Sequence, residues 1–230
     1  TMKIATYNIH SSVGTDGRHD PVRIARTICE IEPDLIGLQE VDAGYWIEGG
    51  EETIGCLEFD TGLTMFSGPT LTRRDTSFGN ALLSRLPLDN LKRIDLSVPG
   101  YEPRGALVAD LIDKNKQIRV IVTHFGLKRR ERKKQIRGLL EILEDDGADL
   151  TLLLGDFNEW SLIGSIRREL NRRMGKAASR STYPSRIPFL RLDRIWCRPR
   201  SALRKVRVHK SETARRASDH LPLVAEITLD

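Results

Sequence analysis

Polar side chains stand at the ends of several apolar segments of this chain. Asn8 follows MKIATY, and Glu40 lies inside LQEV. An acidic group in an apolar segment is costly to bury unless a partner or a cation offsets its charge. Groups of this kind at several strand ends predict one shared pocket that is rich in carboxylates. The candidate residues are Asn8, Glu40, His124, Asp156, Asn158, Asp193, Asp219 and His220.

These residue types fit the hydrolysis of a phosphoester. The oxygen atoms of Glu40, Asn8 and Asp219 suit Mg²⁺ or Mn²⁺, which bind through one or two carboxylates together with substrate phosphate oxygens. A phosphodiester also needs a group that deprotonates or orients a water molecule. Asp156 beside Asn158 suits that task, with the carboxylate as the base and the amide as the orienting group. A zinc hydrolase is less favoured, because the chain lacks the histidine-rich ligand spacing of zinc sites.

The elements that must position these residues begin as strand, helix and strand. Residues 3–9 are rich in β-formers and predict a core strand. Asp20-Pro21 is typical of a helix start, and isoleucines at 24, 28 and 31 share one helical face before Pro33 ends the helix. Residues 34–41 then predict a second strand. The segment 11–19 between the first strand and this helix predicts a loop.

The rest of the chain mixes hairpin-like pairs of strands with helices. A helix is predicted after His124, with its buried stripe at Ile136, Leu139, Leu140 and Leu143. This mixture predicts an α/β fold of the α+β type, a four-layer α/β/β/α sandwich of two mixed sheets. The other predicted strands are 81–84, 106–112, 117–123, 150–154, 190–197, 203–209 and 221–229, and a further helix is predicted at 161–174.

Composition restricts the class of protein. The 230 residues are 39% hydrophobic and 30% charged, which suits one domain over residues 1–230 that can bury a sizeable core. No apolar run reaches the length of a membrane span, and the N-terminus shows no signal-peptide pattern. The three cysteines are scattered and favour a reducing compartment. We therefore expect a cytoplasmic monomer.

The net charge of +5 is unevenly distributed along the chain. The densest basic run is Lys128 to Lys134, and shorter runs lie at 167–168, 172–173 and 215–216. Basic patches attract polyanions, but such a run is more often the solvated face of a helix. The charge alone does not choose between these two interpretations.

The chemical residues stand in motifs that resemble a known superfamily. The motifs occur in the order Thr6-Tyr7-Asn8, Leu38-Gln39-Glu40, Gly79 to Ser84, Thr123-His124, Gly155-Asp156-Phe157-Asn158, Leu192 to Ile195 and Ser218-Asp219-His220. Together they resemble the endonuclease/exonuclease/phosphatase superfamily, which has the DNase I-like fold. Thr123 to Leu127, Arg129 to Arg132, Tyr183-Pro184 and Arg191 to Ile195 are similar to a small bacterial YbhP-like subgroup.

The resemblance implies a role for each residue. Glu40 would be the main Mg²⁺ ligand, with Asn8 and Asp219 close to the metal. Asp156 would activate the attacking water, and Asn158 would hold the water and the phosphate. His220, oriented by Asp193, and His124 would bind phosphoryl oxygens. Asn80 and Arg104 would be further phosphate contacts.

One position departs from the pattern of the apurinic endonucleases. These enzymes carry an acidic metal ligand two residues after the first-strand asparagine, and His10 stands there in this chain. His10 weakens the DNA-repair interpretation, and the short chain leaves little room for the insertions that grip duplex DNA. We expect a phosphodiesterase or phosphomonoesterase acting on a lipid headgroup or small molecule. A DNA or RNA nuclease is the alternative, and a catalytically silent polyanion-binding module is less favoured.

Overall fold

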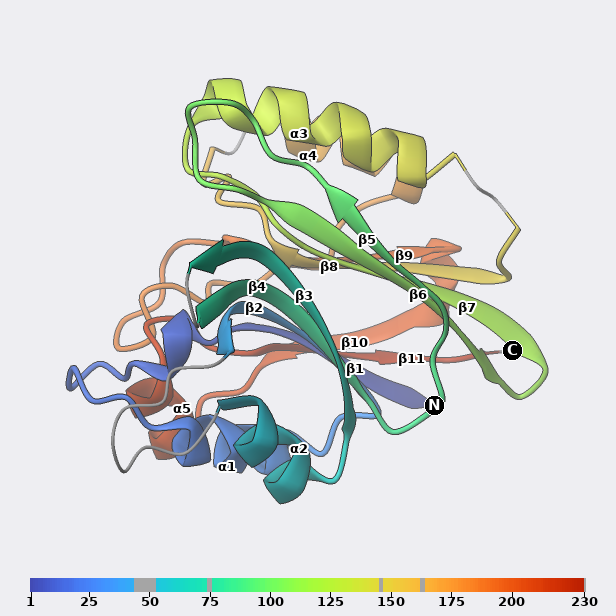
Figure 1. Cartoon of the computed structure of the whole chain (residues 1–230). Coiled ribbons are helices and arrows are strands. Elements are labelled where there is room, and N and C mark those ends of the chain that lie inside the picture. Colours follow the sequence, from blue (N-terminus) through green and yellow to red (C-terminus); the bar gives the residue numbers. More distant parts are fainter. Residues whose placement is uncertain (44–52, 74–75, 145–146, 162–163, 230) are drawn as a thin grey trace.

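The computed structural model describes residues 1–43, 53–73, 76–144, 147–161 and 164–229. Two β-sheets pack face to face, and helices cover the outer face of each sheet (Figure 1). The layers are therefore helix, sheet, sheet and helix. This arrangement confirms the predicted four-layer sandwich.

The first sheet has the strand order β10-β11-β1-β2-β4-β3. β1 pairs in parallel with β2 and antiparallel with β11, so the sheet is mixed. The strands are β1 (Met2–Asn8), β2 (Leu35–Ala43), β3 (Thr64–Arg73), β4 (Thr76–Ser84), β10 (Leu203–Val208) and β11 (Leu223–Ile227).

The second sheet has the order β5-β6-β7-β8-β9. β7 and β8 are parallel, whereas the β5–β6, β6–β7 and β8–β9 pairs are antiparallel. The strands are β5 (Asp89–Asp95), β6 (Gly105–Asp113), β7 (Lys116–His124), β8 (Leu150–Asp156) and β9 (Asp193–Arg198).

The helices divide between the two outer faces (Figure 1). α1 (Pro21–Ile31), α2 (Thr53–Thr61) and α5 (Glu212–Ala217) cover the first sheet, and α3 (Arg129–Ile142) and α4 (Ser165–Met174) cover the second. The Asp20 side chain accepts a hydrogen bond from the backbone N–H of Arg23, which confirms the predicted start of α1. Short 3₁₀ helices occupy His10–Ser12 and Arg200–Ala202.

The largest core lies between the two sheets. Leu107, Val120 and Val122 of the second sheet pack there with Ile4 and Leu82 of the first. Two further cores lie beneath the helices, one under α1 and one under α3 and α4. Because both sheets are covered on both faces, their central strands are continuous apolar runs.

Among the described strands and α-helices, β3, β5, α2 and α5 were not predicted from the sequence. β5 is an edge strand with the polar sequence DNLKRID, and six of its seven residues are exposed. Short, polar or proline-containing segments carry little periodic signal. The predicted strand 190–197 is observed as Asp193–Arg198, the strand 81–84 extends back to Thr76, and the helix 161–174 is observed from Ser165.

The basic run Lys128 to Lys134 lies mainly on the exposed face of α3. Arg129, Arg130, Lys133 and Lys134 are exposed. Arg132 is instead buried and donates hydrogen bonds to the carbonyl oxygens of Gly126 and Leu127. One arginine of this run therefore fixes the loop after β7.

In the described part of the chain, no helix has the length and apolar character needed to cross a membrane.

Candidate active site

A pocket of about 430 Å³ opens where the two sheets meet at one end of the sandwich. The carboxyl ends of β1, β2, β7 and β8 reach this end, and so do the amino ends of β6 and β9 and the segment that precedes β11. Seven of the ten predicted site residues line this pocket. They are Glu40, Arg104, His124, Asp156, Asn158, Asp219 and His220. Asn8, Asp193 and Asn80 lie buried behind them.

The first sheet contributes Asn8 and Glu40. Glu40 lies at a register shift between β2 and β4 and has a positive φ of 56°. A bulge of this kind redirects one side chain out of the strand pattern, and a positive φ at a residue other than glycine is a strained backbone state. The Asn8 Nδ2 atom donates to Glu40 Oε1 at 2.9 Å and to Asp156 Oδ2 at 3.2 Å. Asn8 thus joins the two sheets through two carboxylates.

The second sheet contributes three residues in one cross-strand row. His124 is paired with Asp156 between β7 and β8, and Asp156 is paired with Asp193 between β8 and β9. The residue before Asp156 in this row is Gly155. A side chain does not fit there, because a Cβ atom would lie 2.0 Å from the carbonyl oxygen of Thr123. The strand pairing therefore fixes the order of the three side chains.

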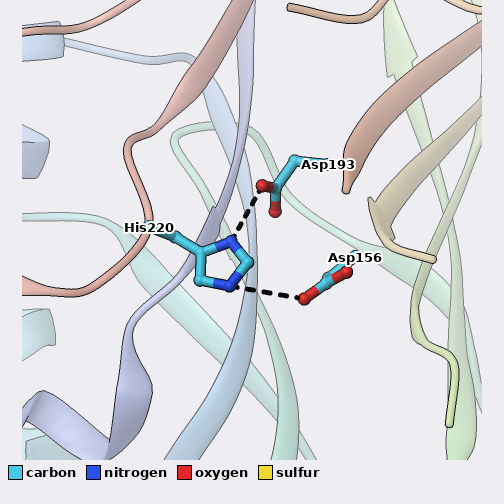
Figure 2. A group of neighbouring side chains, drawn as sticks. All are labelled: Asp156, Asp193 and His220. Atoms are coloured by element: carbon cyan, nitrogen blue, oxygen red, sulfur yellow. Dashed lines mark hydrogen bonds and ion pairs between the residues drawn. The ribbon is translucent and has the colours of Figure 1, made fainter. Parts of the chain in front are cut away.

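His220 lies between two carboxylates (Figure 2). Its Nδ1 atom is 2.9 Å from Asp193 Oδ2, and its Nε2 atom is 3.7 Å from Asp156 Oδ2. Burial by itself lowers the pKa of His220, but the charges of Asp193, Asp156 and Asp219 outweigh burial and raise the pKa to about 10. The imidazole is therefore cationic at neutral pH. Asp193 Oδ2 also accepts a hydrogen bond from the Thr182 hydroxyl.

His124 has the opposite electrostatic character. Burial lowers its pKa to about 3, so this imidazole is neutral. Its Nε2 atom is 3.1 Å from the Asn158 side-chain nitrogen, which also donates to the carbonyl oxygen of Phe125. Asn158 in turn has a positive φ of 47°, and its backbone N–H donates to Asp156 Oδ1. His124, Asp156 and Asn158 are therefore held as one hydrogen-bonded unit.

The donor set of the pocket fits a hard divalent cation. Glu40 and Asp219 both line the pocket, and carboxylate oxygens are the ligands that Mg²⁺ and Mn²⁺ prefer. Burial raises the pKa of Glu40, a desolvation cost that a bound cation would offset. Asn8 presents its nitrogen to the carboxylates, because its amide oxygen accepts from the His10 backbone N–H. In this arrangement Asn8 orients Glu40, whereas a ligand role would require the amide oxygen to face the pocket.

A second acidic group lies deeper in the site. Ligand atoms of Asp156, Asp193 and His220 lie within 4.8 Å of one another. The Nδ1 atom of His220 is hydrogen-bonded to Asp193 Oδ2, which also accepts from the Thr182 hydroxyl, so hydrogen bonds and charge account for the positions of these side chains. Asp219 stands apart from it, with Oδ1 4.0 Å from His10 Nδ1.

Asn80 and Arg104 lie on the same side of the pocket but differ in access. Arg104 is 7% exposed, lines the pocket, and pairs with Glu102 through Nη1. Its Nε atom is buried and has no hydrogen-bond partner among the residues that the structure describes. Asn80 donates to the carbonyl oxygen of Gly105 and lies behind the pocket wall. The structure thus presents Arg104 to a ligand more directly than Asn80.

Several residues around the site were not identified from the sequence. Tyr183 lines the pocket, and its ring centroid lies 4.8 Å from that of His220. Glu159 is buried and accepts from the backbone N–H of Arg167 near the start of α4, while its own carbonyl oxygen accepts from Arg194. These contacts hold the loop that carries Asn158 and Trp160. Only the position of Glu159 directly after Asp156-Phe157-Asn158 could have suggested its role.

The fold and the site place the chain in the DNase I-like class. The endonuclease/exonuclease/phosphatase family model matches residues 5–220, and the chain belongs to this family. Enzymes of this family hydrolyse phosphoester bonds and typically depend on a divalent metal. The resemblance seen in the sequence motifs is thereby confirmed.

The chain is also similar to individual known proteins in sequence or in fold. The Uncharacterized protein YbhP of Escherichia coli K12 is 32% identical, with 100% of this chain and 97% of YbhP covered. The mannosyl-6-phosphatase Bt3783 of Bacteroides thetaiotaomicron has a TM-score of 0.76 at 16% identity, with full coverage of both chains. TDP2 of D. rerio, in complex with a single-strand DNA product, has a TM-score of 0.71 at 18% identity and 99% coverage of each chain. The two structures show the shared fold.

Proposed function

We propose that this protein is a Mg²⁺- or Mn²⁺-dependent phosphoesterase that cleaves a phosphodiester, or a phosphomonoester, by direct attack of water. The observation that carries the proposal is the position of Asp156 Oδ2. This atom lies within 3.7 Å of the Asn8 amide and of the Nε2 atoms of both histidines. A carboxylate, a neutral imidazole and a cationic imidazole therefore face one small volume.

Each side chain has a task that its geometry supports. Asp156 takes a proton from the attacking water, and Asn158 orients that water through its amide. His220 donates from Nε2 to a phosphoryl oxygen, since its charge is held by Asp193 through Nδ1. His124 contacts the same phosphate as a neutral group. Arg104 adds a fixed positive charge at the pocket wall, and Asn80 supports that wall from behind.

The metal would be held by Glu40 and Asp219, with Asn8 orienting Glu40. When bound, it supplies positive charge that polarises the phosphoryl group. The Asn8 amide nitrogen donates a hydrogen bond to the carboxylates of both Glu40 and Asp156. This arrangement limits their mutual repulsion before substrate arrives.

The size of the pocket supports a compact substrate. A volume of about 430 Å³ suits one compact phosphoester group, such as a small molecule or a lipid headgroup. A nuclease remains the second candidate, because Arg129 and Arg130 are exposed beside the pocket loops and TDP2 is a structural relative bound to DNA. A silent binding module is less favoured, since the residues proposed as base, metal ligands and phosphate contacts line one pocket.

The test is a hydrolysis assay with purified protein and Mg²⁺, Mn²⁺, Zn²⁺ or EDTA. The substrates are bis(p-nitrophenyl) phosphate, p-nitrophenyl phosphate and single-stranded DNA. We expect hydrolysis of the diester with Mg²⁺ or Mn²⁺ and its loss with EDTA and in Asp156→Ala. Preferential cleavage of DNA would favour the nuclease. Absence of hydrolysis with every metal, in folded protein, would refute the proposal.

A further inference from the structure

Large apolar side chains stand exposed on the loops around the pocket. Leu127 is 68% exposed, Trp160 69%, Ile187 77% and Phe189 67%. We call these four residues the apolar rim. Single exposed apolar residues are common on protein surfaces, but several around one opening mark a binding surface.

The apolar rim is attached directly to the pocket wall. Leu127 and Trp160 line the pocket themselves, and Phe189 immediately precedes Leu190, which also lines it. The loop that carries Ile187 and Phe189 is closed by hydrogen bonds from the N–H groups of residues 189 and 190 to the Tyr183 carbonyl oxygen. Because the Tyr183 ring packs against His220, this loop begins beside the pocket.

Four other exposed apolar residues do not share this arrangement, whereas Tyr101, which is 39% exposed, directly precedes the pocket residue Glu102. Val22 lies on α1, Phe59 on α2, Leu91 on the edge strand β5 and Ile112 near the β6–β7 turn. β6 begins at Gly105, directly after the pocket residue Arg104, so Ile112 lies at the other end of that strand. These four residues belong to separate elements, and none of them lines the pocket.

Cationic side chains flank the apolar rim. Lys128 and Arg129 follow Leu127, Arg186 precedes Ile187, and Arg191 follows Leu190. All four are exposed, and we call them the basic flank. The acidic residue Glu102 at the same opening is paired with Arg104. The surface around the opening thus combines apolar tips with positive charge.

We propose that the apolar rim and basic flank dock on an anionic phospholipid bilayer, so that the pocket acts on the phosphoester of a lipid headgroup. This inference rests on the proposed function for its catalytic part. Leucine, isoleucine and aromatic tips enter the boundary between headgroups and acyl chains, and arginine and lysine bind the negative surface. The lipid headgroup is then delivered at the mouth of the pocket.

A bilayer explains the rim better than a nucleic acid does. Single-stranded nucleic acids bind proteins through stacking on aromatic faces together with positive charge. Trp160 and Phe189 can stack in that way, but Leu127 and Ile187 have no ring. Two exposed aliphatic side chains at the opening gain free energy from acyl chains and none from base stacking.

The first experiment measures binding without turnover. The full chain in EDTA is sedimented with phosphatidylcholine vesicles that contain or lack phosphatidylglycerol, and the Ile187→Ser/Phe189→Ser variant is compared with Ile112→Ser. We expect wild type and Ile112→Ser to bind the anionic vesicles. The double variant should bind them at least about tenfold more weakly. Equal binding by all three proteins, or no binding by wild type, would overturn the proposal.

The second experiment separates docking from catalysis. Hydrolysis of soluble bis(p-nitrophenyl) phosphate should be the same in wild type and the double variant, whereas release of headgroup from phosphatidylglycerol vesicles should fall in the variant. Vesicle binding that depends on the rim, without hydrolysis of either substrate, supports docking and refutes the proposed function. If the protein hydrolyses soluble bis(p-nitrophenyl) phosphate but does not bind vesicles, docking alone is refuted. The bilayer assignment would also be overturned if wild type did not bind vesicles but bound single-stranded DNA or self-associated, and if the double variant lost that binding or self-association.

Discussion

The floor and the rim of the pocket are built in opposite ways. The floor residues Asp156, Asp193 and His220 are buried, stand at strand ends and are connected by hydrogen bonds and ion pairs. The rim residues Trp160, Ile187 and Phe189 are exposed, and they stand on loops. A buried network fixes charge and geometry, whereas exposed loop residues can change without loss of the core. We infer that the floor determines the reaction and the rim selects the substrate.

The largest predicted effect is at the floor. Asp156→Ala removes the proposed base and leaves both histidines without their shared carboxylate, so kcat/KM for bis(p-nitrophenyl) phosphate should fall about 10³-fold. The measurement is steady-state kinetics at saturating Mg²⁺. Asp113→Ala at the end of β6 is the control and should retain wild-type activity. A tenfold or smaller loss in Asp156→Ala would show that another group is the base.

A smaller loss is predicted for the residue behind His220. Asp193→Asn removes the nearest charge that raises the pKa of His220, so this pKa should fall from about 10 toward its ordinary range. The cationic form should then be lost at a lower pH, and kcat should decrease about 10²-fold. NMR titration of the metal-free protein reads the pKa directly. An unchanged His220 titration would contradict this account of the charge.

The metal site provides the next prediction. Glu40→Gln keeps the shape of the side chain but removes its charge, so the Mg²⁺ concentration for half-maximal activity should rise about tenfold. Asp42→Asn, two residues further along β2, is the matched control because Asp42 does not line the pocket. A Mg²⁺ requirement that is unchanged in Glu40→Gln would place the metal elsewhere.

The smallest predicted effect concerns Glu159, whose contacts hold the loop between Asn158 and α4. Glu159→Ala removes the acceptor for the Arg167 N–H near the start of α4, so the free energy of unfolding should fall by about 1–2 kcal/mol. Urea denaturation measures this change. Glu169→Ala, which removes a half-exposed ion pair with Arg172, should change stability by less than about 1 kcal/mol. Similar losses in the two variants would argue against a special role for Glu159.

The site could be predicted from the sequence because each chemical residue interrupts or ends an apolar strand. Asp156 and His124 follow long apolar runs, so their strands and their polar ends are visible in the sequence. The structure brings seven predicted residues to one pocket and three directly behind it. Their individual roles stay predictions. Neither Tyr183 nor Glu159 was predicted to belong to the site, because their contacts come from partners far away in the chain or from a loop without periodicity.

The sequence by itself determined where along the chain the strands that carry the chemical residues lie. It also determined the family to which the chain belongs, since both follow from local patterns. The tertiary structure decided which atoms meet. The Asn8 nitrogen faces two carboxylates, His220 is cationic while His124 is neutral, and four exposed apolar residues gather around one opening. Each of these properties depends on contacts or burial among residues distant in sequence, which local propensity does not encode.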